Sequence, residues 1–120
     1  LFTVSGGRVA ILEIVGQVTT IIQAQANATK LVSTPTVGTA GDMCATLDIN
    51  AKEAGTLFGI TGLQTDAMIG INASVLPGPT RRPLAILDVG TIGLNCAASS
   101  TGSVKWDIYY FPLDPGASIA

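Results

Sequence analysis

The side chains that could do chemistry in this chain are eight carboxylates and two cysteines, and histidine is absent. Without histidine the chain lacks the usual proton shuttle, the Ser-His-Asp and Cys-His arrangements and the commonest metal ligand. A carboxylate pair for glycosidic cleavage is formally possible. However, most of the acids lie within two residues of Gly, Asn or Pro, where turn capping explains them. We therefore expect no enzyme activity, no catalytic residue, no metal and no cofactor.

The two cysteines stand in a repeated pattern. VGTAGDMCA, which ends after Cys44, and VGTIGLNCA, which ends after Cys96, share Val-Gly-Thr-x-Gly-x-x-Cys-Ala. We interpret the pattern as a glycine turn feeding a strand whose cysteine points inward, which favours two buried thiols. The alternative is a Cys44–Cys96 disulfide, which a secreted adhesin-like domain would require, although disulfide scaffolds of this size normally carry more cysteines.

The low charge of the chain limits its partners. Of the 120 residues, 48% are hydrophobic and only 12% are charged, against roughly 25% in ordinary soluble domains. A surface of Ser, Thr, Gly, Ala and Asn does not repel its neighbours, which favours a subunit packed in an assembly. The net charge is −2 and only Arg81 and Arg82 are adjacent basic residues, so we expect no nucleic-acid partner. The most apolar stretch, 9–15, is far shorter than the about 20 residues of a membrane span, so we expect no membrane partner.

The elements expected from the pattern are strands of a single domain over residues 1–120. No segment keeps a helical apolar period over three turns, and Asn50 begins one turn at most. Gly and Pro punctuate the chain at the spacing of an all-β protein. The repeated cysteine pattern fits two similar halves. We therefore expect a β-sandwich of the jelly-roll or double Greek-key type.

The aromatic residues gather in one expected strand, GSVKWDIYYFPLDPG (102–116). Alternation puts Trp106 and Tyr110 on an apolar face, which we expect to pack in the core. The opposite face begins with charged residues and then becomes apolar at Tyr109, Phe111 and Leu113. A sugar or base platform would need several aromatics on one face, and Trp106 faces away from the others. We therefore predict that Tyr109, Phe111 and Leu113 form a partner-contact patch.

Two further segments are candidates for partner contact. The Pro-rich loop LPGPTRRP (76–83) is either a solvated turn or presents Arg81 and Arg82 as a clamp on a carboxylate of a neighbouring subunit. Leu1 and Phe2 are expected to form a short arm that orders on a neighbour.

Both ends of the chain, LFTVSGGRVAILEIVGQVTT and GTIGLNCAASSTGSVKWDIYYFPLDPGAS, resemble small virion proteins of tailed bacteriophages that decorate and cement the capsid. The resemblance implies a β-sandwich that forms homodimers or homotrimers on the capsid outer surface. It also implies that the protein stabilises the shell by bridging neighbouring subunits of the major capsid protein. The alternative is a receptor- or glycan-binding module of a phage tail fibre or spike.

Overall fold

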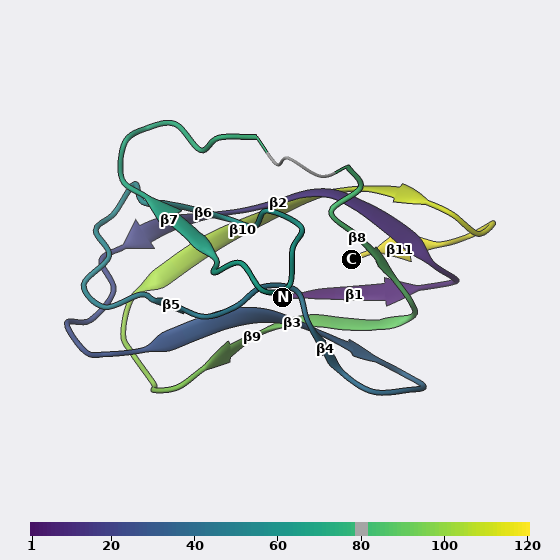
Figure 1. Cartoon of the computed structure of the whole chain (residues 1–120), viewed down its shortest axis with the longest axis horizontal. Helices are drawn as coiled ribbons and strands as arrows, with labels where there is room; N and C mark the ends of the chain where they lie inside the picture. Colours follow the sequence, from purple (N-terminus) through teal and green to yellow (C-terminus); the bar gives the residue numbers. More distant parts are fainter. Residues whose placement is uncertain (79–81) are drawn as a thin grey trace.

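Two antiparallel β-sheets pack face to face in the computed structural model, which describes residues 1–78 and 82–120 (Figure 1). Within these residues there is no helix, and the segment at Asn50 is a turn. The predicted all-β sandwich is confirmed. The jelly-roll connectivity stays a prediction.

The first sheet has the strand order β11-β1-β9-β3-β4, and β5 also pairs with β3. Its strands are β1 (Phe2–Ser5), β3 (Ala28–Pro35), β4 (Gly41–Asp42), β5 (Leu47–Asp48), β9 (Gly90–Cys96) and β11 (Ser118–Ile119). The second sheet has the order β10-β2-β6-β7, and β8 also pairs with β2. Its strands are β2 (Val9–Thr20), β6 (Leu57–Gly59), β7 (Ile69–Ile71), β8 (Ala85–Leu87) and β10 (Ser103–Pro112).

The core lies between the sheets and takes its side chains from the inward-facing positions of both. Its largest fully buried apolar members are Val4, Val9, Ile11, Ile14, Val18, Leu31, Phe58, Met68 and Ile92. One side of the sandwich is closed where Ala45 exchanges backbone hydrogen bonds with Asp66 and Met68. On the other side the outermost strands are β11 and β10. The long strand β10 is therefore an edge strand of the second sheet.

A glycine in the middle of β2 lets two aromatic rings meet. Gly16 is opposite Phe58 of β6 and opposite Trp106 of β10, so the three residues form one row across the sheet. The rings of Phe58 and Trp106 stack with centroids 6.1 Å apart. A Cβ at position 16 would lie 2.9 Å from the Trp106 ring. The absence of a side chain at Gly16 therefore fixes Trp106 against the core.

The two cysteines are free, but only one is buried, so the prediction of two buried thiols is wrong for Cys96. Cys96 follows Ile92 and Leu94 on the inward positions of β9, and burial falls along that series from buried through half-buried to exposed. The core does not fill this end of the sandwich, so an inward-pointing side chain reaches solvent there. No disulfide joins Cys44 and Cys96. Burial raises the pKa of the Cys44 thiol.

Candidate partner-binding surface

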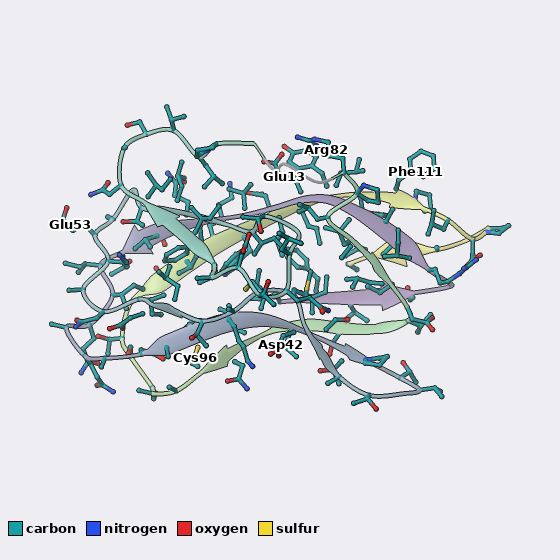
Figure 2. The ribbon with its side chains drawn as sticks, viewed as in Figure 1. Glu13, Asp42, Glu53, Arg82, Cys96 and Phe111 are labelled. Carbon is teal, nitrogen blue, oxygen red and sulfur yellow. The ribbon has the colours of Figure 1, made fainter. Side chains whose placement is uncertain are left out.

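The outer face of β10 carries Tyr109 and Phe111, two of the three apolar residues predicted for partner contact, and Leu113 follows directly after the strand. The exposed fractions are 62% for Tyr109, 61% for Phe111 and 44% for Leu113. Ile86 of β8 adds to them, because Phe111 and Ile86 both lie opposite Ala10 of β2 in one row across three strands. Tyr109, Phe111, Leu113 and Ile86 are called the outer patch below. Figure 2 shows Phe111 pointing away from the sandwich.

The outer patch is anchored by pairing with β2 and by hydrogen bonds between Arg8 and the residues that follow β10. The β2–β10 pairing shifts register between Tyr109 and Tyr110. Beyond the strand, the Leu113 amide donates to the Arg8 carbonyl at 2.9 Å. The Arg8 guanidinium and backbone amide donate three hydrogen bonds to Asp114, at 2.8–3.0 Å. These Arg8 hydrogen bonds lower the pKa of the Asp114 carboxyl to about 2.

Charged side chains lie on the same side of the second sheet as the outer patch. Glu13 lies opposite Tyr109 in the sheet, and Arg82 is exposed just before β8. In Figure 2 Glu13, Arg82 and Phe111 lie along the same outer side of the second sheet. Arg81, the other arginine of the predicted clamp, lies outside the described residues. Glu13 is therefore the direct neighbour of Tyr109 in the sheet, and Arg82 is exposed on the same outer side (Figure 2).

The two N-terminal candidates lie on the first sheet, apart from the outer patch. Phe2 belongs to β1, pairs with Ile92 and packs against the core. Leu1 is exposed, and its nitrogen donates to the Ile92 carbonyl at 2.8 Å. The structure thus places Phe2 in a strand rather than in a free arm, because β9 offers its backbone groups to β1. Partner contact by Leu1 and Phe2 stays a prediction.

Two clefts stand out on the surface that the described residues form. One, of about 660 Å³, lies at the unfilled end of the sandwich and is lined in part by Leu1, Leu94, Cys96, Val104 and Trp106. The other, of about 610 Å³, lies beside β8 and is more polar, with Ser33, Thr39, Asp42, Gln64 and Asp88 in its lining. Within residues 1–78 and 82–120 no three His, Cys, Asp or Glu side chains cluster to hold a metal. Neither cleft brings together a recognisable catalytic set.

Two features of the molecule could not be found from the sequence, namely Ile86 in the outer patch and the cleft that Cys96 lines. Ile86 enters the outer patch only because β8 pairs with β2, and a three-residue strand is too short to show an alternating pattern. The cleft of about 660 Å³ that Cys96 lines lies where core side chains no longer fill the space between the sheets. No local signal in the sequence marks that position.

No family model matches the chain, and searches of curated proteins and of solved structures also find no match. In the part of the chain that the structure describes, no helix is long and apolar enough to span a membrane.

Proposed function

We propose that this chain is a structural protein of a tailed-phage virion that binds the outer surface of the assembled capsid and bridges neighbouring major capsid subunits. The observation that carries the proposal is the outer patch. It presents four exposed apolar side chains on one side of a sheet, in a chain with few charges. Aromatic residues of this kind are the usual anchors of protein interfaces.

The mechanism is thermodynamic. A protein that binds the assembled shell but not its separated subunits stabilises the shell by mass action. Many copies placed by the symmetry of the shell let modest contacts combine through avidity. Arg82, exposed on the same outer side as Phe111 (Figure 2), supplies a guanidinium that can pair with a carboxylate of the capsid subunit and fix the orientation.

The test is co-sedimentation with purified virions, gently stripped capsids and isolated tails, with the copy number of the chain measured in each. We expect hundreds of copies on DNA-filled heads and fragile capsids after their removal. Phe111→Ser should lower the amount bound to stripped capsids at least about tenfold, since truncated interface anchors cost this much or more. Val37→Ser is the matched control, because Val37 is 86% exposed and lies in the turn before β4.

A receptor- or glycan-binding module of a tail fibre or spike is the second candidate. It is favoured by one observation: Tyr109 and Phe111 are exposed on the same face as Asp107, the residue two places before Tyr109. Aromatic rings can stack on sugar rings while a carboxylate accepts hydroxyl hydrogen bonds. Against it, Trp106 is turned to the inner face and stacks on Phe58. A few copies that travel with tails, together with sugar affinity of the isolated chain, would replace the capsid proposal by this one.

A further inference from the structure

The free edge of β10 is the longest unpaired strand edge that the described residues contain. β10 runs from Ser103 to Pro112 and pairs with β2 alone, while its other side has no strand partner among the described residues (Figure 1). An unpaired edge presents a row of backbone N–H and C=O groups that can pair with another strand. Lys105 and Pro112 are residue types that often protect such edges from pairing with other chains. A strand that pairs here must therefore be compatible with both residues.

The direction of each peptide group along β10 follows from hydrogen bonds at both ends. Near its C-terminal end the Leu113 amide donates to Arg8, so the groups of residue 113 face β2. At the other end of the pairing, the backbone groups of Val18 in β2 bond to Gly55 and Thr56, just before β6. The backbone groups of the preceding residue, Gln17, therefore point the opposite way, toward β10. Lys105 is opposite Gln17, so its backbone groups point toward β2. The hydrogen bonds at the two ends agree, because both give odd-numbered residues of β10 whose backbone groups point toward β2. The peptide groups of Val104, Trp106, Ile108 and Tyr110 therefore point to the free edge, and so does the nitrogen of Pro112, which has no hydrogen.

The charges on β10 are complementary to those of a second copy of the same strand. Lys105 and Asp107 lie on one face on either side of Trp106, both exposed, with Nζ and Oδ2 3.8 Å apart. In an antiparallel pair related by a twofold axis through Trp106, Lys105 lies opposite the partner's Asp107, and Asp107 lies opposite the partner's Lys105. Opposite charges at directly facing positions stabilise a sheet, and like charges destabilise it.

Neighbouring registers are worse. An axis through Lys105 or through Asp107 sets that charge against its own copy. An axis through Ile108 removes both charge pairs and sets the nitrogen of Pro112, which cannot donate, against Val104 of the partner. Only the axis through Trp106 combines two charge pairs with edge-facing amides at Val104, Trp106 and Ile108.

The inner face of β10 is left incomplete by a single copy. Val104, Trp106, Ile108 and Tyr110 pack against the core but are only half-buried, whereas Ile14 and Val18 on the adjacent strand β2 are buried. The cleft that Val104 and Trp106 line opens at the same end of this strand. In the register through Trp106, the partner's Trp106 and Ile108 extend the apolar inner face where the single copy leaves it open.

We propose that two copies of the chain pair through β10 in this register and form one continuous antiparallel sheet across a twofold axis at Trp106. This inference does not depend on the proposed function, because it rests on the edge and not on the outer patch. A monomeric chain that binds capsids would overturn the dimer alone. A dimer that does not bind capsids would overturn the capsid proposal alone.

Charge reversal tests the partner and the register together, with sedimentation velocity over a range of protein concentrations as the assay. Lys105→Asp and Asp107→Lys, each alone, set like charges opposite one another at both facing positions. Each should raise the dimer dissociation constant at least about tenfold. The double variant Lys105→Asp/Asp107→Lys restores opposite charges and should return the constant close to its original value. High salt should weaken the original dimer, since both pairs are exposed.

The matched control is the Lys30–Asp42 ion pair on the first sheet, with Nζ and Oδ2 2.7 Å apart. Asp42→Lys changes the charge equally but lies away from β10, so the dimer constant should not move. Amide hydrogen exchange gives a second readout that does not depend on charge. The Trp106 and Ile108 amides should gain protection as the protein concentration rises, while those of Lys105 and Asp107 are already protected by β2.

Four results would overturn the proposal. Three of them are a monomer at all concentrations, a trimer, and a dimer whose dissociation constant does not change in the Lys105→Asp variant. A dimer that both single reversals weaken but the double variant does not restore would show a different register and would also overturn it.

Discussion

Gly16 offers a direct test of how the second sheet holds its aromatic row. Replacing Gly16 by Ala puts a Cβ 2.9–3.0 Å from three atoms of the Trp106 ring, closer than van der Waals contact allows. The ring must move, and the open cleft beside Trp106 gives it a direction. Movement of the ring separates it from Phe58, with which it now stacks.

The expected size of the effect combines two opposing terms. Extra atoms in a packed site typically cost about 1–3 kcal/mol. Replacing a strand glycine by alanine recovers about 0.5–1 kcal/mol of backbone entropy. The midpoints of these two ranges differ by about 1 kcal/mol, so we expect Gly16→Ala to lower the free energy of unfolding by about 1 kcal/mol. Gly93 provides the control, because it lies in β9 and a Cβ there has no atom within 4 Å. Gly93→Ala should be neutral or stabilising by up to about 1 kcal/mol.

The assay is urea unfolding followed by the fluorescence of Trp106, the only tryptophan, together with near-ultraviolet circular dichroism of the folded state. Gly16→Ala should lower the midpoint and change the aromatic dichroism, while Gly93→Ala should leave the dichroism as it is. If Gly16→Ala were as stable as Gly93→Ala with an unchanged aromatic spectrum, the reasoning about the row would be refuted.

Two further predictions concern ionisable groups. The pKa of Asp114 is about 2 in the folded chain, held down by Arg8, and about 3.9 in an unfolded one, so its stabilising contribution is complete above about pH 4 and is lost as the pH falls toward 2. Urea midpoints measured across this range should fall less steeply for Asp114→Asn than for the original chain, with a remainder from Asp48, whose pKa is also lowered by backbone hydrogen bonds. In native protein one thiol per chain, Cys96, should react rapidly with a thiol reagent, and Cys44 only after unfolding. Peptide mapping checks this assignment, and equal rates for the two thiols would contradict the burial difference.

The faces of β10 could be predicted from the sequence because a strand alternates with a period of two. Ten consecutive residues that alternate leave little freedom, and Trp106 and Tyr109 lie on the faces expected of them. The all-β class followed in the same way from the spacing of Gly and Pro. These features depend on local chemistry, which one sequence carries in full.

The features that sequence reasoning missed depend on long-range packing. Cys44 and Cys96 share one local pattern, yet one is buried and the other opens into a cleft, because the core ends before the last residue of β9. Ile86 joins the outer patch through a pairing of β8 with β2 that spans most of the chain. Phe2 lies in β1 because the distant strand β9 pairs with it. In each case the residues that decide the outcome lie far away in the sequence and come close only in the folded chain.

The two proposals are connected by the geometry of antiparallel pairing. A twofold axis through Trp106 that extends one sheet stands perpendicular to that sheet, so both outer patches of the dimer lie on the same side. Phe111 is five residues from Trp106, and a strand advances about 3.4 Å per residue. The two copies of Phe111 would then lie about 35 Å apart along the joined strands. A pair of patches at that spacing can contact two neighbouring subunits at once, so pairing through β10 would add a second way for the chain to bridge the shell.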